Sequence, residues 1–314
     1  MSWREPEARR CVVLCAGIAV LDQVFRVERF PVPEAKTRAT DFVTVSGGNA
    51  GNAAIAIARL GGRAALAAPL GGPAGDDTVG DRILAYLEDE TIDCAACVRI
   101  VGARSPISAI VVDARGERTI VNHRDEALIR ARVADPVRLA STADVVLADN
   151  RFPEFVLPIC AAARASKRPV VLDFDQPTRE TDALLALGSH VVFSAEGLRA
   201  TADREDLAAA LRHIRDRTDA FLAVTDGAHD MICLHGTTCE RLPTFAVEAI
   251  DTLGAGDVFH GAYALALAEG HDAIEAMRFA AAAGAAKCMQ FGGIAGAPER
   301  RHVAALLAGA GRVP

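Results

Sequence analysis

Aromatic side chains are scarce in this chain. They make up 5% of its 314 residues, with only two Tyr and one Trp. Such a composition is poorly suited to a pocket that stacks aromatic rings on a nucleobase. Hydrophobic residues nevertheless reach 51%, so Ala, Val and Leu must build the interior. A chain of this length and composition can bury one large core, and α/β domains of this size are common.

Long basic and long apolar runs are also missing. The formal net charge is −7 and no block of Lys or Arg occurs, so nucleic acids and anionic membranes are poor partners. No apolar run approaches the roughly 20 residues of a membrane span. The start, Met1 to Glu5, has no apolar segment of the kind found in signal peptides. We therefore expect a cytoplasmic protein.

Cysteine motifs are nearly absent as well. Only Cys94 and Cys97 form a CxxC pair, and no second pair or histidine follows at the spacing of a zinc site. We interpret this pair as structural. Most other cysteines lie in apolar stretches, which predicts buried thiols in a reducing compartment; these are Cys11, Cys15, Cys160, Cys233 and Cys288.

What the chain does contain is a regular alternation of short apolar runs and Ala-rich helical patterns. This alternation predicts an open parallel sheet with helices on both faces and ligands at the carboxyl ends of its strands. Two segments, Val24–Val45 and Pro106–Asn122, instead alternate with period 2, as half-exposed antiparallel strands do. The expected core strands are Cys11–Ala16, Ala64–Pro69, Val145–Ala148, Val170–Asp173, His190–Phe193 and Phe221–Thr225, and the expected helices are 49–60, 76–90, 153–167, 203–217, 257–269 and 272–288.

The segment Asp251–Asp257, with the sequence DTLGAGD, runs directly into a helical pattern. Gly254, Ala255 and Gly256 have almost no side chain, so their amides can approach a ligand, and a helix N-terminus attracts phosphate. A carboxylate at Asp257 would repel phosphate, but it can accept the proton of an attacking hydroxyl. The simpler alternative is that Asp257 only caps the helix.

A second glycine motif, SGGNAGNAAIAIARLGG, occupies Ser46–Gly62. The paired Gly47 and Gly48 let the backbone approach a polyhydroxy ligand, and Asn52 can donate to and accept from sugar hydroxyls. By itself this pattern would fit an ordinary turn before a buried helix.

Together the two motifs resemble, in order and spacing, the signatures of the ribokinase family, also called the phosphofructokinase B family of carbohydrate kinases. The resemblance spans nearly the whole chain and implies one ribokinase-like α/β domain over residues 1–314. It also implies a β-sheet lid formed by about 22–46 and 104–123, through which two copies pair as a homodimer. The implied activity is transfer of the γ-phosphoryl group of ATP to a primary hydroxyl of a sugar. Mg²⁺ is the implied cofactor, and use of a monovalent cation is left open.

Further site residues follow from the resemblance. Asp22, after the first strand, matches a family Asp that binds sugar hydroxyls, although an ordinary turn carboxylate is the alternative. Thr225 and Gly227 match a turn that meets ATP phosphates. Lys287, within 286–293, would flank the adenosine. Glu196 keeps the acidic residue of an N-x-x-E motif that contacts Mg²⁺ through water, but the Asn is missing. His260, three residues after Asp257, is most simply a packed helix histidine.

Three polar residues suggest an anionic substrate. Arg151 follows a core strand, while Lys36 and Asn122 belong to the expected lid. These three residues, the DVFHGA sequence at 257–262 and the glycine-rich tail after Lys287 resemble sulfofructose kinases within the family. The resemblance suggests a ketohexose-type acceptor such as 6-deoxy-6-sulfofructose. Solvated surface charges are the alternative interpretation of Arg151 and Lys36.

Other functions stay open at this point. Fructose, ribose, 2-keto-3-deoxygluconate or a nucleoside could be the acceptor, and the scarcity of aromatic residues speaks against a nucleoside. A sensor that binds a sugar or nucleotide without catalysis could share the fold, since a fold does not fix a function. A sensor has no need of a carboxylate inside an anion-binding turn, and this favours the enzyme.

Overall fold

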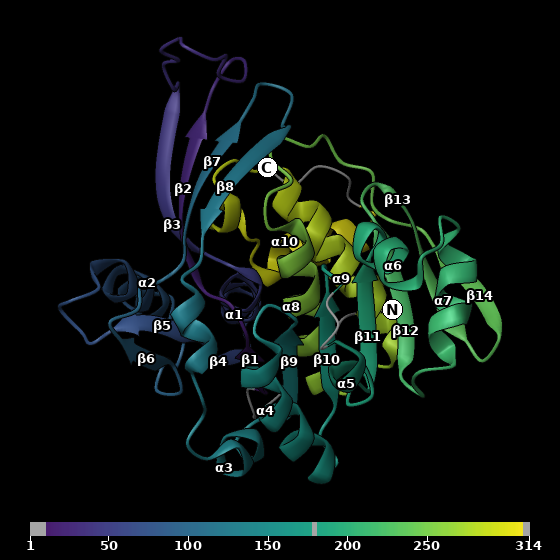
Figure 1. Ribbon diagram of the computed structural model, residues 1–314. Coiled ribbons are helices and arrows are strands. Elements are labelled where there is room, and N and C mark those ends of the chain that lie inside the picture. Colours follow the sequence, from purple (N-terminus) through teal and green to yellow (C-terminus); the bar gives the residue numbers. More distant parts are fainter. Residues whose placement is uncertain (1–10, 178–180, 310–314) are drawn as a thin grey trace.

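The computed structural model describes residues 11–177 and 181–309. At its centre lies a sheet of eight strands in the order β14-β13-β12-β11-β10-β9-β1-β4 (Figure 1). The six strands from β12 to β4 are parallel, whereas β13 and β14 are antiparallel. The strands are β1 (Val12–Ala16), β4 (Arg63–Ala67), β9 (Val145–Asp149), β10 (Val170–Phe174), β11 (His190–Ser194), β12 (Phe221–Asp226), β13 (His229–His235) and β14 (Thr238–Leu242).

Side chains alternate between the two faces of this sheet, and each face is covered by helices. Val13 and Cys15 of β1 pack with α1 (Asn49–Arg59), α8 (Ala255–Ala268), α9 (Ala273–Cys288) and α10 (Arg300–Leu307). Leu14 and Ala16 pack on the opposite side, against the second helical layer. That layer contains α3 (Pro136–Ser141), α4 (Pro153–Ala165), α5 (Thr181–Leu185), α6 (Ala195–Ala202) and α7 (Leu207–Arg215).

A separate four-stranded sheet, which we call the lid, rises beside the carboxyl ends of the core strands (Figure 1). Its order is β3-β2-β7-β8, and its strands are β2 (Val20–Arg26), β3 (Asp41–Gly47), β7 (Ile107–Val112) and β8 (Arg118–His123). The inner face carries buried residues such as Val24 and Ile110, while Phe42 and Val121 on the outer face are exposed. A two-stranded sheet of β5 (Pro69–Gly72) and β6 (Val98–Val101) and helix α2 (Thr78–Asp89) lie near the base of the lid (Figure 1).

The expected architecture is confirmed, but several elements differ from the prediction. The strands β6, β13 and β14 and the helices α3, α5, α6 and α10 lie outside the predicted elements. The lid is only partly antiparallel, because the hairpins β2-β3 and β7-β8 join through a parallel β2-β7 pair. The single helix expected over 203–217 is wrong at its start. Asp203 adopts a left-handed φ of 51°, which ends α6, and α7 begins at Leu207 behind the N-cap Asp206.

No disulfide joins the cysteines, all of which lie in the described residues. Cys15, Cys160 and Cys233 are buried as expected, whereas Cys11 and Cys288 are only half-buried. Within the described residues, no helix combines the length and apolar character needed to cross a bilayer.

Candidate active site

The turn before α8 brings glycine amides and a carboxylate together. Gly254 is the N-cap and adopts a left-handed φ of 77°, a conformation that favours glycine. The first amides of α8 lack helical partners, and the helix dipole adds positive potential at the same place. Asp257 lies in the first turn of α8 and is half-buried. A Cβ on Gly256 would meet no atom within 4 Å, so this side of the turn is open.

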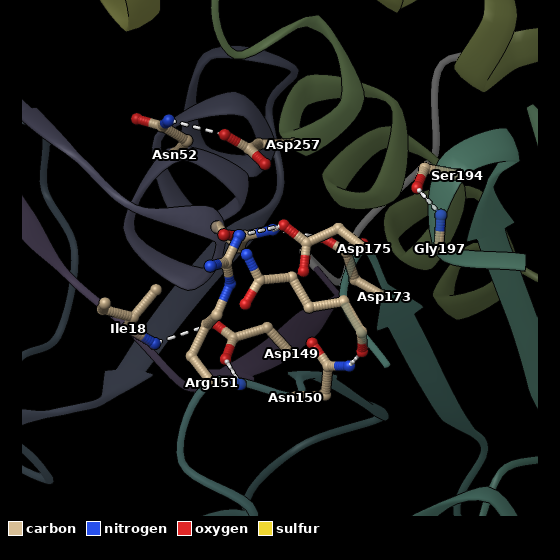
Figure 2. Close-up of polar contacts among 12 residues, drawn as sticks. Ile18, Asn52, Asp149, Asn150, Arg151, Asp173, Asp175, Ser194, Gly197 and Asp257 are labelled. Atoms are coloured by element: carbon tan, nitrogen blue, oxygen red, sulfur yellow. Dashed lines mark hydrogen bonds and ion pairs between the residues drawn. The ribbon is translucent and has the colours of Figure 1, made fainter. Parts of the chain in front are cut away.

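Asp257 is held by a residue from the other glycine motif. Nδ2 of Asn52, on α1, donates to Oδ2 of Asp257 at 2.6 Å, and Figure 2 shows the two side chains pointing toward one another. Asn52 is buried, and no described residue bonds its Oδ1. A buried acceptor without a protein partner suits a ligand hydroxyl. Burial is the main cause that raises the pKa of Asp257, while the bond from Asn52 opposes that rise.

Asp22 approaches the same place from the lid. A Cβ on Gly47 would collide with the Asp22 carboxylate, so the glycine is required for this packing. Burial raises the pKa of Asp22 to about 6; a hydrogen bond from Ser108 lowers it, and the charge of Asp257 raises it further. The effect of the Asp257 charge on Asp22 indicates that the two carboxylates lie near one another.

The register of the lid places Asn122 in line with Asp22. Asp22 pairs with Ser108 on β7, and Ser108 pairs with Asn122 on β8. Directly paired residues project from the same face of a sheet, so these three side chains form one row on the inner face. Lys36 lies elsewhere, exposed in the loop 27–40 that connects β2 and β3.

Arg151 lies at the carboxyl end of β9 and is already ion-paired. Its guanidinium binds Asp175, which follows β10, and its side chain is 22% exposed (Figure 2). Asp149 supports this turn, because its carboxylate accepts from the amides of Ile18 at 2.7 Å and Arg151 at 2.9 Å. Burial raises the pKa of Asp149 to about 6. Arg151 therefore faces the site, but an anionic ligand would have to compete with Asp175.

Several polar residues of this site were missed or undervalued by sequence reasoning. Asn49 donates to Asp173 at 2.9 Å and to Asp175 at 3.3 Å, linking α1 to β10. In the sequence, Asp173 and Asp175 end a strand and fit either caps or metal contacts made through water. The available signal was positional: Asp149, Asp173 and Asp175 all end neighbouring parallel strands, and such ends meet at one edge of the sheet.

The residues expected near the nucleotide lie around the ends of β11 and β12. Thr225, at the end of β12, donates to the Phe193 carbonyl at 3.4 Å, and Gly227 follows with a left-handed φ of 59°. Glu196 is exposed in the first turn of α6, where Ser194 caps the helix by accepting from the Gly197 amide at 3.0 Å. No three acidic, histidine or cysteine side chains of the described chain are grouped as a metal site.

Lys287 is fully buried and binds the loop that leads into the glycine turn. Its Nζ donates to the Asp251 carbonyl at 2.8 Å and lies 3.3 Å from the Asp251 carboxylate. That carboxylate also accepts from the amides of Leu253, Gly292 and Gly293. Burial lowers the pKa of Lys287, and Asp251 opposes this shift. Lys287 thus fixes the backbone at 251–253, and its expected contact with adenosine stays a prediction.

The geometry combines a proton acceptor with an anion-binding helix N-terminus, which is the chemistry of phosphoryl transfer to an alcohol. The class is therefore that of a small-molecule phosphotransferase with a ribokinase-like fold. Comparison with known sequences gives the family: the chain belongs to the pfkB family of carbohydrate kinases, whose sequence profile matches residues 12–300. It is a sugar kinase.

Individual relatives cover almost the whole chain. The ribokinase of Bacillus subtilis is 28% identical over 95% of this chain and 98% of its own length. The ATP-dependent ribose-1-phosphate kinase of Halopiger xanaduensis is 30% identical over 94% of this chain and 97% of its own. The crystal structure of a candidate ribokinase from Agrobacterium tumefaciens is 37% identical, covers 97% of this chain and all of its own, and superposes with a TM-score of 0.92.

Proposed function

We propose that this kinase transfers the γ-phosphoryl group of ATP to a primary hydroxyl of a ketohexose-type sugar, with Asp257 as the general base. The observation that carries the proposal is the Asp257 carboxylate inside the glycine turn, held at Oδ2 by Asn52. With Oδ2 engaged, Oδ1 receives the proton of the attacking hydroxyl. The sugar oxygen then bonds to the γ-phosphorus, and the bond to the bridging oxygen breaks to release ADP.

The other site residues have roles that fit their positions. The amides of Gly254 to Asp257 stabilise the charge of the phosphoryl group in transfer, because they are preorganised donors at a helix N-terminus. Asp22 and the free Oδ1 of Asn52 accept from sugar hydroxyls, beside the closely packed Gly47 and Gly48.

Magnesium fits this site only as an ion carried by the nucleotide. Mg²⁺ is commonly bound by one or two carboxylates, waters and substrate phosphates. Glu196, exposed in the first turn of α6, can contact such an ion through water. When bound, Mg²⁺ supplies positive charge that neutralises the polyphosphate. We propose that Thr225 and Gly227 meet the same phosphates, and the use of a monovalent cation stays an open prediction.

An anionic acceptor, such as 6-deoxy-6-sulfofructose, is the finer proposal. Arg151 lies close enough to Asp257 for its charge to lower the pKa of that carboxyl, and Asn122 stands in the row of Asp22. The exposed Lys36 is the third proposed ligand and would have to approach from the loop 27–40. The Halopiger relative, named a ribose-1-phosphate kinase, acts on an anionic sugar, while the Bacillus relative is named a ribokinase.

The outer face of the lid supports a homodimer. Phe42 is 48% exposed and Val121 69% exposed, and the ring of Phe25 lies beside that of Phe42 with centroids 4.7 Å apart. The register puts these residues on one face of the sheet. Pairing of two lids would cover this apolar surface. Replacing Phe42 with Asp should then yield a monomer in sedimentation analysis, and an unchanged mass would contradict lid pairing.

An acceptor screen tests the function directly. ADP release with ATP·Mg²⁺ should be measured with fructose, ribose, 2-keto-3-deoxygluconate, 6-deoxy-6-sulfofructose and nucleosides. We expect the highest kcat/KM for a ketohexose-type sugar and very low activity for nucleosides. ATP and sugar binding without turnover for any acceptor would instead point to a sensor.

A further inference from the structure

His260 makes two hydrogen bonds that a neutral imidazole cannot make together. It lies on α8, one turn after Gly256, and is 4% exposed. Its Nδ1 is 2.8 Å from the Gly256 carbonyl oxygen, and its Nε2 is 3.1 Å from the Val192 carbonyl oxygen on β11. Carbonyl oxygens only accept, so each ring nitrogen must carry a proton. A neutral ring has one N–H, and its other nitrogen would direct a lone pair at a carbonyl oxygen.

The surroundings supply the negative charge that an imidazolium needs. Nε2 of His260 lies 3.6 Å from Oδ1 of Asp173, and both side chains are buried. The charged groups that face this pair are Asp257 on the same helix, Asp175 after β10, and Arg151 after β9. The contact of β11 with His260 is made by the Val192 carbonyl, which carries no net charge. Three carboxyl groups thus face one guanidinium. Burial and the neighbouring carboxylates raise the pKa of Asp173 to about 7, and an imidazolium at His260 opposes this rise.

We propose that His260 is a permanent imidazolium at neutral pH, and that its fixed charge keeps the Asp257 carboxylate in its proton-accepting form. His260 would then be a positioning residue, since it touches neither substrate nor phosphoryl group. The second half of the proposal rests on the proposed function of Asp257, whereas the first half does not. Consistent with the second half of the proposal, burial is the main cause that raises the pKa of Asp257, and the nearby His260 charge lowers it.

The charge state can be measured without any enzyme assay. In wild-type protein with ¹⁵N-labelled histidine, NMR at pH 8 should show both ring nitrogens of His260 protonated, and His260→Gln identifies the signals. His190 is the internal control. It is half-buried, its Nδ1 lies 2.9 Å from Ser189 Oγ, and burial lowers its pKa to about 4, so it should be neutral. A neutral His260 at pH 8 would overturn the proposal.

The pH dependence of kcat/KM tests the effect on Asp257. Gln at position 260 can still donate a hydrogen bond but carries no charge, so the acidic limb should move upward by about one pH unit or more. Activity lost near pH 7 should return at higher pH. His190→Gln should leave the limb in place. A uniform loss across all pH values would show that His260 only packs the helix. If the sugar kinase assignment itself fails, the NMR measurement still decides the charge.

Discussion

Asn52 and Asp257, 205 positions apart, are joined by a 2.6 Å hydrogen bond between α1 and α8. The bond connects the two glycine motifs into one site. It also selects one oxygen of the proposed base, because Oδ2 is engaged and no described residue donates to Oδ1. Each motif supplies one partner of this bond.

Replacing Asp257 with Asn should remove turnover but leave ATP and sugar binding nearly unchanged. The change deletes the proton acceptor and keeps the shape of the side chain. We expect kcat to fall by ~10²–10⁴-fold or more. Isothermal titration would follow binding, and Asp272→Asn, which changes an exposed cap of α9, is the matched control. A variant that retained more than a tenth of wild-type kcat would exclude Asp257 as the base.

Two glycines of α8 should respond in opposite ways. A side chain at Gly256 meets no atom within 4 Å, so Gly256→Val should fold but obstruct the amides of the turn and abolish phosphoryl transfer. A Cβ at Gly261 would lie 2.6 Å from the Ala53 carbonyl oxygen, so Gly261→Val should destabilise the packing of α8 on α1. Thermal unfolding and kcat separate the two effects. Normal activity in folded Gly256→Val would refute the anion-binding role of the turn.

Arg151→Ala tests the anionic acceptor. Charge-assisted hydrogen bonds contribute roughly 1.5–3 kcal/mol each, so KM for an anionic sugar should rise by about one to two orders of magnitude. KM for fructose should barely change. Arg132→Ala, which breaks an exposed pair with Glu154, controls for a general loss of positive charge. Equal effects on both sugars, or a wild-type preference for neutral sugars, would leave only the broader sugar-kinase assignment.

Lys287→Met should destabilise the protein strongly. It removes the buried ammonium and leaves the Asp251 carboxylate without its cation, a change that typically costs about 3–5 kcal/mol. The double variant Asp251→Asn, Lys287→Met should recover part of the loss, because no buried charge remains. Denaturant unfolding measures both, with Lys36→Met as an exposed control. Wild-type stability in Lys287→Met would show that the ion pair contributes nothing to the fold.

The buried carboxylate of Asp22 should make stability depend on pH. Its pKa is raised from 3.8 to about 6, so the folded state binds more protons than the unfolded state between these values. The contribution of Asp22 to the free energy of unfolding is therefore complete below pH 4 and is lost as pH rises through about 6. Over this range the free energy of unfolding changes by at most about 1.4 kcal/mol per pH unit. Asp22→Asn should flatten the unfolding free energy across this range. Asp41→Asn, an exposed change on the same lid, should leave the slope as it is.

The main architecture could be predicted because its signals are local. Short apolar runs such as 145–148 and glycine-bounded helices such as α1 define their own secondary structure, and their strict alternation implies a parallel sheet. The antiparallel strands β13 and β14 escaped prediction, since the apolar run of β13 spans only 231–234 and the charged Glu240 and Arg241 interrupt β14. The helical pattern is broken between α6 and α7 by the left-handed conformation of Asp203. An Asp in a sequence does not by itself predict that conformation.

The site could be predicted only in part, because its contacts join residues that lie far apart in the sequence. Asp257 and Asn52 stand in recognisable motifs, but their bond depends on the order of strands that separate them. The pairing of Arg151 with Asp175 has the same origin, because both follow neighbouring strands, β9 and β10. The role of Asp149 depends on two backbone amides, and a sequence gives no sign of such contacts.

The row of Asp22, Ser108 and Asn122 crosses three lid strands, while Asp257 and its glycines belong to α8. On the proposed assignment, this row carries part of the recognition of the acceptor and α8 carries the chemistry of transfer, while Asn52 on α1 links the two because it binds Asp257 and has a free oxygen for the sugar. Substitutions along the row can alter which sugar is accepted without disturbing the base. On the proposed assignment, such a division lets new acceptor preferences evolve, or be engineered, on an unchanged catalytic core.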